Sequence, residues 1–236
     1  MMSNLLYISL FCSACTLIAS KLLEIIPPTP DEMAYISDDA FSRIKILEAE
    51  AEVCDSLKFN FNFKTPYNYI ERFLRASHAS SESSLSSHRA AMGRGVNNAN
   101  NPLLERLVFY LCDLSMLEYK FVLLKPSLIA ASAVYLARAT LGIREPTPIF
   151  DNEQDFGMIG SSPSFLRVAK GYWSKTLEHY TGYDMWDLED TVKTLLTLQE
   201  SAESSRLKSI FSKHKSEKYM CVALKTVLNE SDLGFF

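Results

Sequence analysis

Two cysteines near the start of the chain have a type and spacing that could serve chemistry. Cys12 and Cys15 form a C-x-x-C pair, a pattern that can perform thiol–disulfide exchange or contribute two ligands to a zinc site. No second cysteine pair or nearby histidine completes a ligand set for zinc. Because both cysteines lie in an apolar run, we expect buried core residues, with redox or metal chemistry as the alternative.

Other catalytic patterns are absent from the sequence. It contains no phosphate-binding loop, zinc-protease or serine-hydrolase signature. Paired acids such as Glu48 and Glu50 lie on helix faces that we expect to be exposed. The histidines are dispersed without metal-ligand spacing: His78, His88, His179 and His214. We therefore predict a non-catalytic protein without cofactor or metal.

Lys21 stands where an apolar, alanine-rich run is about to end. The run resumes for one turn and stops at Pro27 and Pro28. A lysine in this place either extends its ammonium group into solvent or meets a charged partner. The residues around Lys21 alone favour the first interpretation.

The composition is that of an ordinary soluble protein, with 47% hydrophobic and 22% charged residues among 236. The formal net charge of −4 gives no general attraction to nucleic acid or to an anionic membrane, and we expect neither as a partner. The basic stretch at 206–218 is isolated, so we expect a solvated helix there. Five scattered cysteines suit a reducing compartment better than a disulfide framework.

The apolar stretch at residues 5–19 has the length of a signal-peptide core. No lysine or arginine precedes it, and it is shorter than the roughly 20 residues of a membrane span. We interpret it as a buried core helix, with secretion as the alternative.

Helices must position these residues, because apolar side chains recur at helical spacing in both halves of the chain. A helix capped by Ser37 or Asp38 is predicted in the first half. Another begins near Pro102, and an alanine-rich one runs from Pro126 to a stop at Gly142. With 8 Gly and 9 Pro, the chain is poor in the turn residues of a β-sandwich.

Two further patterns bear on the architecture. Phe59–Phe63 alternates phenylalanine with asparagine, and we expect an extended connector that buries alternate rings. Ser13–Lys21 aligns with Ala131–Ala139, and each is followed by a break, a tyrosine-led cap and an amphipathic helix. This similarity predicts a duplicated all-α unit.

Four stretches resemble the cyclins. The sequence ASKLLEIIPPTPDEMAYISDDAF (19–41) looks like part of the first cyclin box of a mitotic cyclin. The sequence YLCDLSMLEYKFVLLKPSLIAASAVYLARATL (110–141) resembles the opening of the second box of A-type, plant-like cyclins. Residues 177–195 and 209–224 continue the match nearly to the C-terminus.

The resemblance implies a regulatory subunit that binds and activates a cyclin-dependent protein kinase in cell-cycle control, in the nucleus and/or the cytoplasm. It implies no obligate homo-oligomer. The family's kinase-contacting lysine falls on Lys21, and its partner glutamate falls on Glu50. The resemblance also assigns Leu22, next to the lysine, to the kinase contact. Phe59 and Phe61 take the places of apolar residues that contact the kinase, with core packing as their alternative role.

Departures from the family pattern shape the expected domains. The chain begins in what looks like the third of five helices, so the helix with the docking patch for Arg-x-Leu substrates is missing. Leu23 replaces a common acidic residue. The prediction is therefore all-α, with tandem five-helix cyclin boxes of which the first is incomplete. Its parts are a partial box at 1–78, a Ser- and Asn-rich linker at 79–101, and a second box at 102–228 with an irregular insertion near 143–172.

Two alternative functions remain open at this point. The chain could be an inactive, truncated cyclin-like paralogue. A DNA-binding transcription-factor core with the same fold is the other alternative, and the net charge of −4 argues against it.

Overall fold

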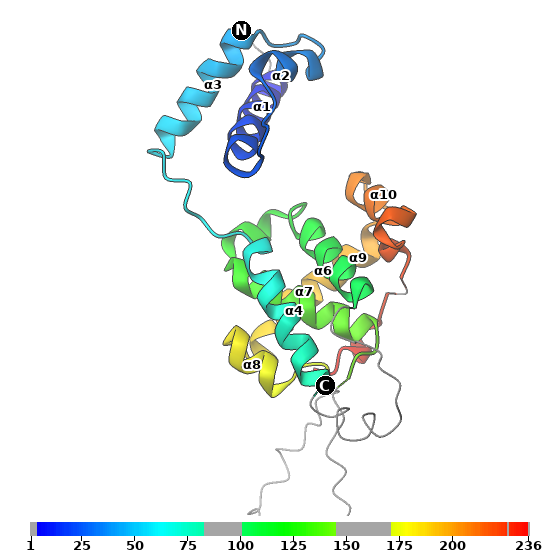
Figure 1. The fold of residues 1–236 in the computed structure, drawn as a ribbon. Coiled ribbons are helices and arrows are strands. Elements are labelled where there is room, and N and C mark those ends of the chain that lie inside the picture. The colour runs from blue at the N-terminus through cyan, green and yellow to red at the C-terminus, as the bar shows by residue number, and fades with distance from the viewer. Residues whose placement is uncertain (1–3, 83–100, 145–170, 226, 236) are drawn as a thin grey trace, which may run out of the picture. The chain divides into compact units, whose positions relative to one another are not determined.

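The structure, a computed structural model, describes residues 4–82, 101–144, 171–225 and 227–235. This described part contains nine α-helices and no β-strand (Figure 1). The all-α class predicted from the sequence is confirmed. The chain divides into two compact units, Met1–Phe63 and Lys64–Phe236, each with its own hydrophobic core.

The first unit is built from α1 (Asn4–Leu23), α2 (Pro30–Ile36) and α3 (Arg43–Ser56). α1 packs against α3, and α2 lies against both. Its core consists of apolar side chains from all three helices and one loop: Leu10, Ala14, Leu17, Ile18, Met33, Phe41, Ile46, Ala49, Val53 and Cys54. Small side chains at Ala14 and Ala49 let the two long helices approach closely.

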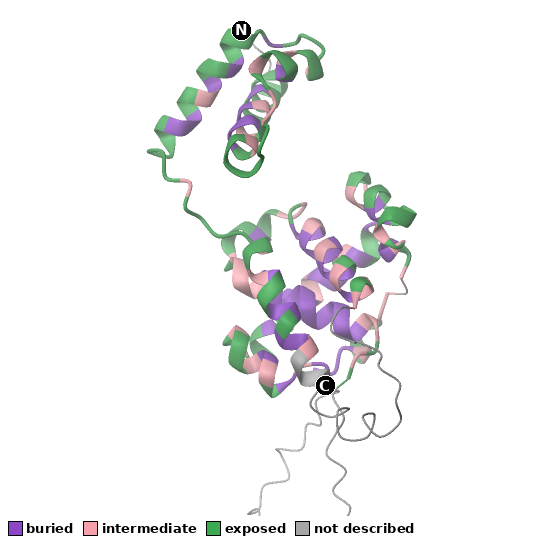
Figure 2. Cartoon of the chain, in the orientation of Figure 1, coloured by how far each residue is buried: buried purple, intermediate pink, exposed green. Residues whose placement is uncertain are grey.

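α1 buries one side and exposes the rest. Its buried residues are Leu10, Ala14, Leu17 and Ile18, whereas other large apolar residues such as Ile8 are exposed (Figure 2). The predicted buried core helix is therefore only partly correct, because α2 and α3 cover α1 from one side. By length and composition, α1 also qualifies as a membrane span, a test that soluble core helices and signal sequences pass as well.

Local capping sets the boundaries of α2 and α3. The Thr29 side chain accepts a hydrogen bond from the Glu32 amide, and the Thr29 amide donates to the Glu32 carboxylate at 2.7 Å. The hydrogen bond from the Thr29 amide and a second one from the Thr29 hydroxyl to the same carboxylate lower the pKa of Glu32. α3 is capped by Ser42 rather than by Ser37 or Asp38 as predicted, because Asp38 adopts a left-handed turn with φ of 54°.

The second unit holds the remaining α-helices of the described residues: α4 (Tyr67–Glu82), α6 (Pro102–Ser115), α7 (Pro126–Thr140), α8 (Lys175–Thr181), α9 (Glu189–Ser201) and α10 (Ser209–Lys215). Short 3-10 turns lie between and after them: η2 (Tyr119–Leu123), η5 (Trp186–Leu188), η6 (Glu217–Tyr219), η7 (Val222–Leu224) and η8 (Glu230–Asp232). α6 begins after the N-cap Asn101, and α7 ends before Gly142, which has φ of 65°. The start of α6 near Pro102 and the end of α7 at Gly142 agree with the positions predicted from the sequence.

α7 is the central helix of this unit. Every residue from Ile129 to Ala139 is buried, and the surrounding helices α4, α6 and α9 all contact α7 (Figure 2). Its alanine and serine side chains allow these neighbours to approach closely. The Tyr135 hydroxyl donates a 2.6 Å hydrogen bond to the carbonyl of Leu233, which fixes the C-terminal segment to α7.

The boundary between the units differs from the predicted linker at 79–101. The first domain predicted at 1–78 includes most of α4, but α4 packs against α6, α7 and α8 in the second unit. The second unit therefore starts at Lys64, and its described residues form α4, α6, α7, α8, α9 and α10. Most of the predicted linker and of the predicted insertion near 143–172 lies outside the described residues.

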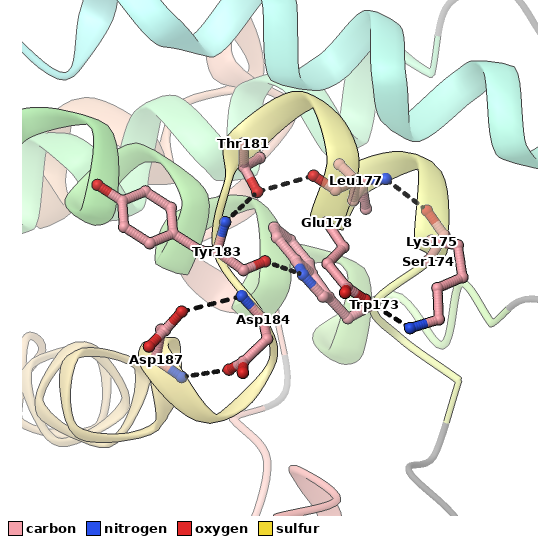
Figure 3. A network of polar contacts seen from close by, with 9 residues as sticks. All are labelled: Trp173, Ser174, Lys175, Leu177, Glu178, Thr181, Tyr183, Asp184 and Asp187. Atoms are coloured by element: carbon pink, nitrogen blue, oxygen red, sulfur yellow. Dashed lines mark hydrogen bonds and ion pairs between the residues drawn. The ribbon is translucent and has the colours of Figure 1, made fainter.

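Side-chain caps fix the entry into α8 and α9 (Figure 3). The Ser174 hydroxyl accepts from the Leu177 amide at the start of α8. Asp184 and Asp187 each accept a hydrogen bond from the amide of the other, which closes the turn before η5. The indole of Trp173 donates to the carbonyl of Tyr183 and ties the two ends of α8 together.

The two units share an internal arrangement. In the first, α1 and α3 pack together with the seven-residue helix α2 between them in sequence. In the second, α7 and α9 do the same, with the seven-residue helix α8 between them. This parallel agrees with the repeat predicted from the sequence, since Ser13–Lys21 lies in α1 and Ala131–Ala139 in α7.

Candidate functional site

Lys21 and Glu50 meet on the surface of the first unit. The Nζ atom of Lys21 lies 2.5 Å from Oε1 of Glu50. Lys21 belongs to the last turn of α1, where a cation also offsets the negative end of the helix dipole. The Lys21 side chain is 43% exposed and that of Glu50 only 14%, so the pair lies at the edge of the core and faces solvent through the lysine.

The packing of α1 on α3 brings the pair together. Glu50 lies between Ala49 and Val53, two buried residues that face α1. On the α1 side, Leu17 and Ile18 are buried one turn before Lys21. The two charged side chains, 29 positions apart in sequence, are therefore neighbours because this apolar contact places their helices side by side.

Exposed apolar residues continue from Lys21. Leu22 is exposed, and Leu23 is 83% exposed. Ile25 and Ile26 in the loop before α2 are almost fully exposed. The sequence interpretation did not include these two isoleucines, although an apolar pair directly before two prolines cannot belong to a continuing helix face and so could have marked them.

Phe59 and Phe61 take different environments at the end of α3. The Phe59 amide donates to the Cys54 carbonyl at 2.9 Å, and Phe59 itself has a positive φ of 53°. This turn leaves the Phe59 ring 67% exposed, whereas Phe61 is partly buried against the first unit's core. The rings lie edge to face with centroids 6.3 Å apart. Of the connector predicted to bury alternate rings, Phe61 alone packs on the core, since Phe63 is exposed as well.

Cys54 lies between Phe59 and the charged pair, because its carbonyl accepts the hydrogen bond from the Phe59 amide. It follows Glu50 by one helical turn, so the two residues lie on neighbouring positions of one α3 face. Together Lys21, Glu50, Leu22 and Phe59 form what we call the α1–α3 surface: an ion pair accompanied by exposed apolar side chains. Such a combination suits protein docking, because a charged pair and exposed apolar side chains occur together in protein interfaces.

The cysteine pair does not behave as predicted. Cys12 is exposed, whereas Cys15 is half-buried and packs against the edge of the first unit's core. All five cysteines are free thiols. Burial and the nearby Cys12 raise the pKa of Cys15, which reduces its thiolate fraction and its reactivity. The described residues include no group of three or more His, Cys, Asp or Glu side chains placed to hold a metal ion.

A second charged cluster lies in the second unit, between α6 and α10. Asp113 accepts hydrogen bonds from Lys213 and from Nε2 of His214, both at 2.8 Å. Burial of Asp113 acts to raise its pKa, but the hydrogen bonds from His214 and Lys213 outweigh it, and the net pKa is lowered. His214 is buried against the rings of Tyr110 and Tyr219. This cluster anchors α10 to the core of the unit.

Comparison with known proteins adds independent findings. Residues 64–228 match the family described as cyclin, C-terminal domain, and residues 4–62 match cyclin, N-terminal domain. The matched ranges coincide with the two compact units.

Curated relatives include plant cyclins of two types. Cyclin-A1-1 of Arabidopsis thaliana is 32% identical over 90% of this chain and 37% of its own length. Cyclin-A1-3 of Oryza sativa subsp. japonica is 34% identical over 90% of this chain and 35% of its own. Cyclin-B1-1, also of Oryza sativa subsp. japonica, is 30% identical over 89% of this chain and 37% of its own length. The chain thus spans little more than a third of the length of these relatives.

Proposed function

Because the chain belongs to the cyclin family, we propose that it binds a cyclin-dependent protein kinase and activates it through the α1–α3 surface. Members of this family are generally non-catalytic regulators, in keeping with a surface that carries no catalytic group. The observation that supports the proposal most directly is the Lys21–Glu50 pair. The two residues that the resemblance assigns to the family's kinase contacts lie next to each other, and the lysine remains accessible.

The composition of the surface fits a protein interface. Leu22 and Phe59 contribute exposed apolar area, and burying such area stabilises a complex by about 25 cal/mol per Å². The ammonium group of Lys21 can donate further hydrogen bonds, since an ammonium carries three donors and Glu50 accepts one. A partner's carbonyl or carboxylate oxygens therefore have a donor available at the centre of the surface.

Activation requires no chemistry in this chain. A protein kinase is active when its regulatory helix αC positions the catalytic Lys–Glu pair. A partner that binds this state more tightly than the inactive one shifts the equilibrium toward it. We place this activity in the nucleus and/or the cytoplasm, with one chain acting on one kinase in cell-cycle control.

The test is a kinase association and activity assay with single substitutions. We expect Lys21→Ala and Glu50→Ala each to weaken association at least tenfold, since truncating one member of a charge contact that is desolvated on binding costs about 2–5 kcal/mol. Lys45→Ala and Glu48→Ala are matched controls, because both residues are exposed on α3 and form no ion pair among the described residues.

Folding is checked in the same preparations by circular dichroism. Equal association by the wild type, Lys21→Ala and Glu50→Ala would remove these residues from the interface. A folded wild-type chain that binds no cyclin-dependent kinase would instead identify an inactive member of the family.

A further inference from the structure

A hollow of about 360 Å³ lies in the second unit between α9 and the segment that joins α6 to α7. α9 forms one wall with Lys193, Thr197 and Glu200, and Glu118 and Lys120 of the joining segment form the other. Buried Leu196 contributes to its floor. The volume is within the range of pockets that receive ligand or peptide side chains.

The 3-10 turn η2 determines which side chains face this hollow. Residues three positions apart in a 3-10 helix lie on the same face. Phe121 is buried and anchors the turn in the core. Lys120 lines the hollow. Leu123, three positions later, lies on the same side of the turn but is not itself one of the lining residues. Tyr119 and Val122 share the third face, which points away from the core residue Phe121.

This segment exposes an unusual amount of apolar surface. Met116, Tyr119, Val122 and Leu123 are each between 70% and 80% exposed, and they fall within eight consecutive residues. Single exposed apolar residues are normal, but a cluster beside a concavity marks an interaction site. Tyrosine and methionine are also enriched at protein interfaces.

The charges around the hollow favour a cation. Three carboxylates and two ammonium groups line it. Lys193 is already paired with Glu189 at 2.8 Å and with Glu230 at 3.2 Å, and these hydrogen bonds raise its pKa. Glu118 and Glu200 form no ion pair with any residue that the structure describes. Their carboxylates are therefore open to a basic group of a ligand.

We propose that this hollow and the exposed side chains of η2 form a docking site for a short segment of a partner protein that carries an apolar side chain next to a lysine or arginine. The apolar side chain contacts Leu123 and the floor of the hollow, and the cation binds Glu118 or Glu200. The site belongs to the second unit, and the proposal is independent of the kinase contact assigned to the first.

The experiment uses the full chain and a displayed library of random 12-residue peptides as the probe. We expect the selected peptides to combine an apolar residue with lysine or arginine, and to bind more weakly at high salt. Synthetic copies measured by fluorescence anisotropy should lose at least tenfold in affinity for Leu123→Ser and for Glu200→Lys, which is about 1.4 kcal/mol.

Two controls change the same residue types elsewhere on the surface. Leu207→Ser and Glu217→Lys alter exposed residues that do not line the hollow, and we expect both to bind the peptides like the wild type. Kinase association is measured on Leu123→Ser and Glu200→Lys as well, and it should remain unchanged.

Several results would overturn the proposal. Selection that yields no binding peptide, or only acidic ones, contradicts the docking site. So does equal binding to the wild type, Leu123→Ser and Glu200→Lys, since the peptides then bind elsewhere. Because Leu123 and Glu200 are exposed, their substitution should leave the circular dichroism spectrum and the unfolding midpoint unchanged.

Discussion

Arg138 on α7 and Ser77 on α4 are joined by two hydrogen bonds in the buried centre of the second unit. Nη1 of Arg138 lies 3.1 Å from the Ser77 carbonyl oxygen and 2.6 Å from its hydroxyl oxygen. Nε of the same guanidinium donates to the Tyr172 carbonyl at 2.8 Å. Both residues are about 1% exposed. The buried guanidinium group of Arg138 thus connects α7 to α4 and to Tyr172, which lies just before α8.

Arg138→Ala should destabilise the second unit strongly. The substitution opens a cavity and leaves the Ser77 and Tyr172 carbonyls without this donor, so we expect a loss of about 3–5 kcal/mol in the free energy of unfolding. Urea unfolding monitored by circular dichroism measures this loss in the free energy of unfolding. Arg75→Ala is the control, because Arg75 is exposed and, within the described part of the chain, pairs only with Glu71 one turn away; it should cost less than about 0.5 kcal/mol. A similar small cost for both variants would show that the buried contacts of Arg138 contribute little.

Exchanging the charges of Lys21 and Glu50 separates their structural role from binding. Either reversal alone, Lys21→Glu or Glu50→Lys, places like charges together, and we expect each to lower stability by about 0.5–1 kcal/mol. The double variant restores an attractive pair and should recover most of that loss. It should not recover kinase association, because the partner then meets each charge in the wrong place. Restored kinase binding in the double variant would mean that the pair acts only within the first unit.

Asp113 should stabilise the folded protein at neutral pH, and this contribution should be lost in acid. Its folded-state pKa is lowered relative to the unfolded chain, so its contribution is fully present above the unfolded value of about 3.9. It is lost as pH falls through the folded-state pKa. The difference in unfolding free energy between wild type and Asp113→Asn should therefore shrink between about pH 5 and pH 2. Urea titrations of both proteins at several pH values measure it, and a difference that stays constant over this range contradicts the assignment.

The connection between the two units should be a preferred site of tryptic cleavage. Lys64 is exposed in a segment, residues 60–65, that has no regular secondary structure. Arg138 is a trypsin site of the same chemistry, but it is buried in the middle of α7. Timed digestion with mass spectrometry should detect cleavage after Lys64 well before cleavage after Arg138. Equally rapid cleavage at both sites would contradict the burial of α7.

Most helices and the family could be predicted from the order of residues, although the N-cap of α3 could not. Helix ends were readable at Asn101 and Gly142 because caps and stops depend on neighbours in the chain. The all-α class and the repeat of α1 and α7 followed from the spacing of apolar and small residues. Lys21 and Glu50 were recognised through their motifs, and their direct contact then emerged from the packing of α1 on α3.

Which helix faces are covered depends on tertiary packing. α4 carries the apolar spacing of a helix that could serve either unit, and only its packing against α7 and α8 assigns it to the second. Cys12 lies in an apolar run, yet it is exposed because α2 and α3 cover the opposite side of α1. Burial is a property of contacts between segments, and the order of residues within one segment does not specify which neighbours it will meet.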